Sequence, residues 1–258
     1  MKDYISISAS SLSSFFRCSF MYKWQFIDGK VPDKISIYTI FGSVLHKALE
    51  LHFKYNLSLD EICSSLNILL THYFSEEKNF EFPSESVFKE YLVKGMLQIS
   101  NVKKMKERWK DYTILDVEKY IKIRFENKYF DNVFLTGKID LLLKNLENII
   151  CLDWKSSKSK ENNIDENIQL TFYMFFVKQL YKYSVENIFG ALAYPIDGEI
   201  LFSQRTENDF SCLFRQINNM LERVHKTDFI KEPKVNMRIN DCFFCQYQRS
   251  CHEDDRRL

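Results

Sequence analysis

The stretch CLDWKSSKSK, residues 151–160, places an aspartate two residues before a lysine at the end of an apolar run. Side chains alternate along a strand, so Asp153 and Lys155 point to the same side of it. Two interpretations are open. One is a strand with a surface ladder of ion pairs that ends in a solvated loop. The other is a metal site beside a catalytic lysine.

The strand before this one supplies a second aspartate. The polar loop Asn145–Asn148 is short, which predicts an antiparallel hairpin. A hairpin centred on this loop sets Asp140 directly across from Asp153, with Cβ atoms about 5 Å apart, and Lys138 is expected on the same face. Two carboxylates this close repel each other unless a cation lies between them. The pair therefore predicts a site for Mg²⁺ or Mn²⁺, where Lys155 could orient a water and offset charge on a phosphate.

Hydrophobic periodicity predicts a mixed α/β domain. Helices are expected at Ser10 or Ser11 to about Phe26, Gly42–Tyr55, about Leu59–Phe74, Ser84–Lys110, about Asp165–Tyr181 and Glu207–His225. Strands are expected at residues 116–126, 132–144, 147–155 and 187–194. In the first of these strands, alternation assigns Glu118 to a polar face with Lys122 and Arg124, opposite Ile121.

Composition limits the class of protein. The chain has 258 residues, of which 45% are hydrophobic and 28% charged, with a net charge of +1. This composition is typical of a soluble globular protein, and it excludes a globally basic nucleic-acid coat but not a local basic groove. No stretch is apolar enough to span a membrane, and the N-terminus lacks the apolar core of a signal peptide. Seven cysteines in such a chain suggest a reducing cytoplasm, where clustered cysteines more often bind metal than form disulfides.

Further motifs accompany the two aspartates. In chain order they are GSVLH with Gly42 and His46, GKID with Gly137 and Asp140, DWK with Asp153 and Lys155, and QLTFY with Gln169 and Tyr173. Four such motifs in this order, each on the expected element, resemble the RecB-like branch of the PD-(D/E)XK nucleases. The resemblance runs from Ser8 to Cys251. It implies a single nuclease domain over residues 1–258, with a restriction-endonuclease-like core in which helices flank a mixed central sheet.

The resemblance also implies a role for each motif residue. The expected metal ligands are His46, Asp140, Asp153 and the main-chain carbonyl of Trp154. Lys155 would be the catalytic lysine, and Gln169 and Tyr173 would hold DNA near the site. A nitrogen ligand favours Mn²⁺ over Mg²⁺.

A cysteine cluster lies near the C-terminus. The stretch CFFCQYQRSC supplies Cys242, Cys245 and Cys251, and three metal ligands need a fourth. RecB-like nucleases with an iron–sulfur cluster take it from the N-terminal helix, in a pattern like S-x-S-x-x-x-F-x-x-C-P. Residues 10–24, SSLSSFFRCSFMYKW, place Cys18 there, with Ser19 in place of the usual proline.

The resemblance implies a [4Fe–4S] cluster on Cys18 and the three C-terminal cysteines, joining residues 1–26 to a cysteine-clustered tail, residues 228–258. Zinc is the alternative, bound by four cysteines or by three and His252, because spacing alone does not discriminate. The other cysteines are expected in the core; they are Cys63, Cys151 and Cys212.

The chain contains no G-x-x-x-x-G-K-[ST] phosphate loop, so no ATP-driven motor is expected. Its length and four cysteines resemble the stand-alone CRISPR-associated RecB-like exonucleases of spacer acquisition, which also occur in phages. The resemblance implies DNA, as single-stranded or frayed ends, as the substrate, and a CRISPR integrase or a recombination complex as a partner. Lys158 and Lys160 are expected to contact DNA, whereas the basic run at residues 103–110 is equally explained as a solvated helix face.

Two other functions are consistent with the sequence. One is a catalytically idle DNA-binding or assembly subunit that keeps the nuclease fold. The other is a zinc-stapled interaction domain, which requires the aspartate–lysine face to be accidental.

Overall fold

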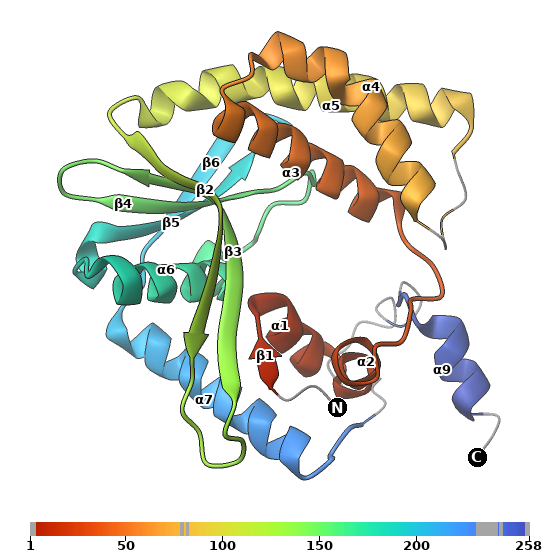
Figure 1. Cartoon of the computed structure of the whole chain (residues 1–258), viewed down its shortest axis with the longest axis vertical. Coiled ribbons are helices and arrows are strands. Elements are labelled where there is room, and N and C mark those ends of the chain that lie inside the picture. The colour runs from red at the N-terminus through yellow and green to blue at the C-terminus, as the bar shows by residue number, and fades with distance from the viewer. Residues whose placement is uncertain (1–3, 78–79, 81–82, 231–241, 243–244, 256–258) are drawn as a thin grey trace. The chain divides into compact units, whose positions relative to one another are not determined.

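The computed structural model describes residues 4–77, 80, 83–230, 242 and 245–255 (Figure 1). The chain forms two compact units. Unit one comprises Met1–Ile35, Lys122–Gly137 and Ser211–Leu258, and unit two comprises Ser36–Ile121 and Lys138–Phe210. Each unit is therefore assembled from separate segments of sequence. The single domain expected over residues 1–258 stays a prediction.

The strands form a mixed sheet in the order β1-β3-β4-β5-β6, with β2 paired to β3 beside this path (Figure 1). Their bounds are Ile5–Ile7 for β1, Thr113–Arg124 for β2, Val133–Lys144 for β3, Ile149–Trp154 for β4, Ile188–Tyr194 for β5 and Glu199–Ser203 for β6. The pairs β1–β3 and β4–β5 are parallel, and β3–β4 and β5–β6 are antiparallel. The mixed central sheet flanked by helices confirms the predicted restriction-endonuclease-like α/β class.

The β3–β4 hairpin has the predicted register. Leu141 pairs with Leu152 and Lys144 with Ile149, so one further step sets Asp140 opposite Asp153. Every residue of β4 is buried, because this strand lies between β3 and β5. A strand that is buried on both faces is expected to consist of apolar residues. Asp153, near the end of β4, is buried together with these apolar residues.

Among the described residues, several helices pack around the strands of unit two. They are α3 (Ile37–Tyr55), α4 (Leu59–Glu76), α5 (Glu85–Lys106) and α6 (Ile168–Tyr181). Helices α3, α4 and α5 pack on one another, and α6 packs on β4 and β5. On β4, Trp154 stacks on Phe53 of α3, with ring centroids 5.7 Å apart. Gly190 of β5 permits the close approach of α6, because a Cβ there would lie 3.1 Å from Leu170.

The first helix expected in the sequence is interrupted in the structure. Helix α1 (Ala9–Arg17) begins at the N-cap Ser8, and α2 (Ser19–Tyr22) is followed by a π-helical turn, Lys23–Ile27. The break lies at Cys18, whose backbone is extended at φ −159° and ψ 108°. Its Sγ accepts a hydrogen bond from the backbone N–H of Met21, so the thiol caps α2.

Described segments from the first and last parts of the sequence pack together within unit one. Met21 and Trp24 form a small apolar core with Tyr247, and Cys18, Phe20, Cys245 and Cys251 pack against it. Two further helices belong to this part of the chain: α7 (Glu207–His225), which begins in unit two, and α9 (Gln248–Asp255), which lies near α2 in Figure 1. Residues 231–241 and 243–244 of the expected cysteine tail lie outside the described residues.

Of the cysteines expected in the core, Cys151 is fully buried in β4, and Cys63 and Cys212 are half-buried. Across the described ranges, none of the helices combines the length and apolar character needed to span a lipid bilayer.

Candidate active site

Asp140 of β3 and His46 of α3 lie next to each other where helix α3 contacts the β3–β4 hairpin. Asp140 is 5% exposed, and its Oδ2 lies 3.2 Å from Nδ1 of His46. The same oxygen accepts the backbone N–H of Trp154 at 2.8 Å, which fixes the carboxylate against β4. Gly42, one turn before His46, allows the helix to lie close, because a Cβ there would be 3.2 Å from Oγ of Ser156.

Asp153 lies at the end of β4 and is 2% exposed. Its Oδ2 is 2.8 Å from Nζ of Lys155, and its Oδ1 accepts Nε2 of Gln169 at 2.7 Å. Gln169 also accepts Nζ of Lys155 on its Oε1 at 2.9 Å. The glutamine of α6 therefore holds the aspartate and the lysine together on one face, as the alternation along β4 predicts for the pair.

Tyr173 lies one turn after Gln169 on α6 and is 4% exposed. Its hydroxyl accepts Nε2 of Gln169 at 2.7 Å and donates to the main-chain carbonyl of Lys138 at 2.6 Å. These contacts tie α6 to β3 beside the two aspartates. The expected role of Gln169 and Tyr173 in holding DNA stays a prediction.

Glu118 of β2 is a site residue that the sequence pattern does not identify. Alternation assigns it to an outer polar face with Lys122 and Arg124, and these two are exposed. The side chain of Glu118 is only 8% exposed and pairs with the ammonium of Lys138, so it does not share the exposed face of Lys122 and Arg124 as alternation predicts. Its φ of +55° is a left-handed conformation that interrupts the regular alternation of β2. The one sequence signal is an acidic residue in a strand that neighbours Asp140.

Among the residues that the structure describes, His46, Glu118 and Asp140 could hold a metal ion. One ligand atom of each lies within 4.8 Å of the others. Asp153 faces the same cluster from β4, since it is the cross-strand partner of Asp140. Imidazole nitrogen and carboxylate oxygens are suitable ligands for Mn²⁺, and carboxylates for Mg²⁺.

Buried carboxylate oxygens indicate that the cluster has room for a cation. Within the described residues, no well-oriented hydrogen bond reaches Oδ2 of Asp153 or Oε2 of Glu118. Each oxygen is paired with a lysine ammonium, from Lys155 for Asp153 and from Lys138 for Glu118. Their remaining lone pairs are therefore available to an ion, and the donor set fits a divalent metal. The main-chain carbonyl of Trp154 stays a predicted ligand.

The electrostatics of the site favour an added positive charge. Burial would lower the pKa of His46, but the carboxylates of Asp140, Asp153 and Glu118 outweigh it and raise that pKa to about 9. Burial and the charge of Asp140 raise the pKa of Asp153 to about 6, although Lys155 and His46 act in the opposite direction. Burial would lower the pKa of Lys155, but the neighbouring carboxylates raise it above its ordinary value. A divalent cation would relieve the same repulsion that protons relieve in its absence.

A cavity of about 600 Å³ in unit two opens beside the cluster. Its walls include Tyr38, Gly42, His46, Glu118, Lys138 and Ser156. The expected DNA-binding lysines follow β4: Lys158 is exposed, and Lys160 is paired with Asp197 at 2.7 Å and with Glu199. Their contact with DNA stays a prediction.

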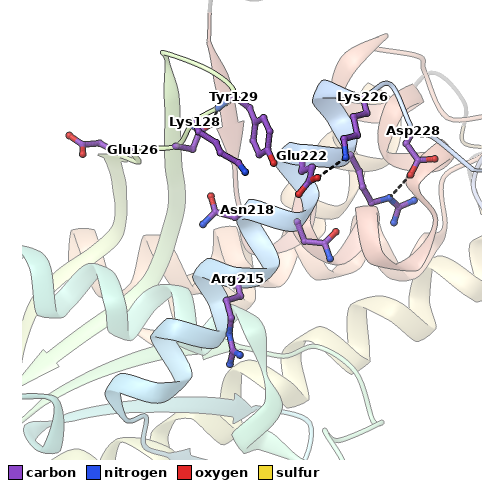
Figure 2. A pocket seen from close by; sticks show the side chains of 11 residues that line it. Glu126, Lys128, Tyr129, Arg215, Asn218, Glu222, Lys226 and Asp228 are labelled. Carbon is purple, nitrogen blue, oxygen red and sulfur yellow. Dashed lines mark hydrogen bonds and ion pairs between the residues drawn. The ribbon is translucent and has the colours of Figure 1, made fainter.

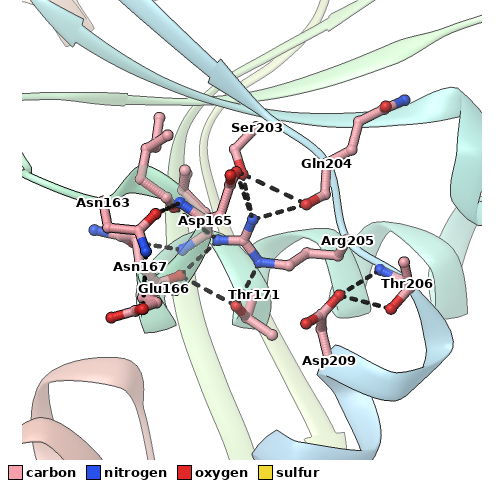
Figure 3. Close-up of polar contacts among 12 residues, drawn as sticks. Asn163, Asp165, Glu166, Asn167, Thr171, Ser203, Gln204, Arg205, Thr206 and Asp209 are labelled. Carbon is pink, nitrogen blue, oxygen red and sulfur yellow. Dashed lines mark hydrogen bonds and ion pairs between the residues drawn. The ribbon is translucent and has the colours of Figure 1, made fainter.

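Arg205 secures the segment that leads into α6 (Figure 3). The residue is 3% exposed, and its guanidinium donates to the side chains of Thr171 and Ser203 and to the main-chain carbonyl of Gln204. It also donates to the carbonyls of Ile164 and Asn167, each at 3.0 Å. Asn167 is the N-cap of α6, so this buried cation positions the helix that presents Gln169.

Unit one has a separate polar pocket of about 800 Å³ between the β2–β3 loop and α7 (Figure 2). Several of its charges neutralise each other: Lys226 pairs with Glu222 at 2.7 Å and Arg223 with Asp228 at 3.2 Å. None of the residues that the sequence singles out for function lines this pocket. The metal-ligand cluster belongs to unit two.

The fold and this cluster agree with a comparison against known families. Residues 6–252 match the model of the PD-(D/E)XK nuclease superfamily, and the chain belongs to that superfamily. Its members are nucleases that use divalent metals such as Mg²⁺ or Mn²⁺, with nucleic acid as the substrate.

No curated protein matches the chain. The crystal structure of SSO0001 is 11% identical with a TM-score of 0.40, over 97% of this chain and 87% of the other. That of protein VC1899 from Vibrio cholerae is also 11% identical, with a TM-score of 0.24, over 77% of this chain and 62% of the other.

The raised pKa of His46 predicts a pH-dependent stability for the metal-free protein. The pKa rises from 6.5 to about 9, so the folded state gains stability below pH 6.5 and loses it as the pH rises through 9. A rise of this size is worth about 3 kcal/mol, and we expect about half of that because a third of the imidazole is exposed. Urea unfolding in EDTA between pH 6.5 and 9 measures the loss.

His46→Gln should flatten this pH dependence. His72→Gln, on the exposed side of α4, is the matched control and should keep it. If the free energy of unfolding of His46→Gln depends on pH as it does in the wild type, the carboxylates do not hold the extra proton on this imidazole.

Proposed function

We propose that this chain is a Mn²⁺- or Mg²⁺-dependent deoxyribonuclease that hydrolyses phosphodiester bonds at single-stranded or frayed DNA ends, as an exonuclease. The observation that supports it best is the convergence of Asp140, Asp153 and Lys155 with His46. His46 is far from the other three residues in sequence, and the fold of unit two brings it to them, beside the cavity that His46 lines.

The residues of this chain divide the work of hydrolysis. His46, Glu118, Asp140, Asp153 and the carbonyl of Trp154 would hold the metal. A bound divalent ion supplies a Lewis acid for the phosphate and lowers the pKa of a bound water. Lys155 is oriented by Asp153 and Gln169, so its ammonium can offset negative charge that develops on the phosphate.

A [4Fe–4S] cluster on Cys18, Cys242, Cys245 and Cys251 belongs to the same proposal. It is supported by the packing of Cys18, Cys245 and Cys251 around the core of Met21, Trp24 and Tyr247. The cluster would join the N-terminal helices to the tail. We assign it a structural role, because phosphodiester hydrolysis needs no electron transfer.

The biological setting is inferred from the resemblance to CRISPR-associated and phage RecB-like exonucleases. We place the protein in spacer acquisition or in recombination and repair, with an integrase or a recombination complex as partner. The proposal needs no ATP.

The substrate preference can be tested with four labelled DNAs of the same sequence: a linear single strand, a duplex with frayed ends, a blunt duplex and a closed circular duplex. We expect the single strand and the frayed duplex to be degraded fastest and the circle to resist, because the reaction starts at an end. Binding should weaken steeply with salt, since lysines displace counterions from phosphates. Equal rates on the circle would contradict an exonuclease and indicate an endonuclease.

An idle assembly subunit is the alternative from another class. It would bind the same single strand, yet leave every labelled DNA intact at all Mn²⁺ and Mg²⁺ concentrations.

A further inference from the structure

Tyr38 occupies the end of the active-site cavity away from the metal-ligand cluster. It lies in the first turn of α3, and its side chain is 69% exposed. Tyr38, Gly42 and His46 are four residues apart and so share one helix face, and all three line the same cavity. Eight residues of helix separate Tyr38 from His46 by about 12 Å. One nucleic-acid strand in the cavity can reach both.

The ring of Tyr38 is held in place from one side. It meets Tyr91 of α5 edge to face, with centroids 6.3 Å apart and an interplanar angle of 63°. Its large exposed fraction leaves a ring face open to solvent. An exposed aromatic face beside a nuclease site is a platform on which an unpaired base can stack.

Lys94 lies beside this ring, and Lys158 follows the cavity residue Ser156 by two positions. Nζ of Lys94 lies 5.8 Å from the Tyr38 centroid, 5.1 Å from that of Phe41 and 5.2 Å from that of Tyr91. Burial and the nearby charge of Lys158 lower the pKa of Lys94, although the charge of Glu90 acts in the opposite direction. Within the part of the chain that the structure describes, neither lysine forms an ion pair. Two cations whose charges act on each other and that form no ion pair favour a phosphate between them.

We propose that Tyr38, Lys94 and Lys158 form a binding subsite for one nucleotide of single-stranded DNA, with the base stacked on Tyr38 and the adjoining phosphate held by the two lysines. A base inside a duplex is stacked between its neighbours, so neither of its faces is free to stack on Tyr38. The subsite therefore selects single strands. The inference rests on the proposed nuclease function and deepens it, because it gives the preference for unpaired ends a physical cause.

Helix α3 also contains a tyrosine that can serve as a control for the proposed role of Tyr38. Tyr55, the last residue of the helix, is 58% exposed, and Nζ of Lys54 lies 5.9 Å from its ring centroid. This second tyrosine–lysine pair is not part of the cavity wall. Removing Tyr55 therefore tests the effect of losing an exposed aromatic ring that has no place in the subsite.

The test is binding of a fluorescein-labelled single-stranded oligonucleotide in EDTA, measured by anisotropy on the full-length protein. Stacking of one base is worth about 1–3 kcal/mol, so Tyr38→Ala should weaken binding by about tenfold or more. Tyr38→Phe and Tyr55→Ala should bind as the wild type does. Affinity for a blunt duplex should be unchanged in Tyr38→Ala. Lys94→Gln and Lys158→Gln should each reduce the salt slope of binding by up to about 0.7.

A scan of oligonucleotides with one abasic site locates the stacked base. At one position, base removal should weaken binding to the wild type but cause no further loss in Tyr38→Ala, because both changes delete the same contact. Equal losses for Tyr38→Ala and Tyr55→Ala, or the absence of any such position, would overturn the subsite.

These outcomes are separable from those of the nuclease proposal. A protein that cuts DNA with metal but shows no Tyr38 effect overturns the subsite alone. A protein that shows the Tyr38 effect but never cuts DNA supports the subsite and contradicts the hydrolytic function.

Discussion

Asp153→Asn is expected to reduce metal-dependent cleavage of a labelled single strand by on the order of 10³-fold, with the fold retained. The substitution keeps the shape of the side chain and removes the charge that would bind the metal and that orients Lys155 at 2.8 Å. Stability should hold or rise, because one of several closely spaced buried carboxylates is neutralised. Asp140→Asn should reduce cleavage to a similar extent.

Two companion variants make the result specific. Lys155→Ala should still bind metal and DNA but cut far more slowly, since it removes charge compensation and leaves the ligands in place. Asp197→Asn is the matched control: it neutralises an exposed carboxylate that pairs with Lys160, and it should cut normally. Normal cutting by Asp153→Asn would show that the aspartate–lysine face is not the active site.

The second large effect concerns the cysteines of unit one. Protein purified without oxygen should be brown and contain about four iron atoms per chain if Cys18, Cys242, Cys245 and Cys251 are all ligands. Serine at any one of them should remove most of the iron and the colour. Unit one should then unfold at lower denaturant, because the chain ends lose their covalent link.

Cys63→Ser and Cys212→Ser are the controls, since both residues are half-buried thiols outside this set. Both variants should keep the iron and the colour. Activity should fall with unfolding when the cluster is lost and should not follow redox potential. A colourless, folded protein with one zinc ion would contradict the iron–sulfur cluster and leave the nuclease proposal untouched.

A feature of the site can be predicted from sequence when it depends on residues that are close together in the chain. The pairing of Asp140 with Asp153 follows from the short loop between their strands, so alternation and loop length are sufficient to predict it. Gln169 and Tyr173 share a helix face by spacing alone. Their partners, the Asp153 carboxylate and the Lys138 carbonyl, depend on how α6 docks on the sheet.

The features that the pattern misses have non-local or exceptional causes. Glu118 enters the site through a left-handed backbone conformation, which no alternation rule anticipates. The break at Cys18 arises because the thiol accepts a backbone hydrogen bond, whereas the surrounding residues favour one continuous helix. Strands β1 and β6 have only three and five residues, too few to show a period.

The most direct test is cleavage of an end-labelled single-stranded DNA by anaerobically purified wild-type protein in Mn²⁺, in Mg²⁺ and in EDTA. If His46, Glu118, Asp140 and Asp153 form a hydrolytic metal site, the DNA is degraded in Mn²⁺, degraded at an equal or lower rate in Mg²⁺, and left intact in EDTA. Excess Mn²⁺ added to the EDTA sample should restore cutting. Intact DNA under all conditions, from folded protein that binds the same strand, would contradict the nuclease function.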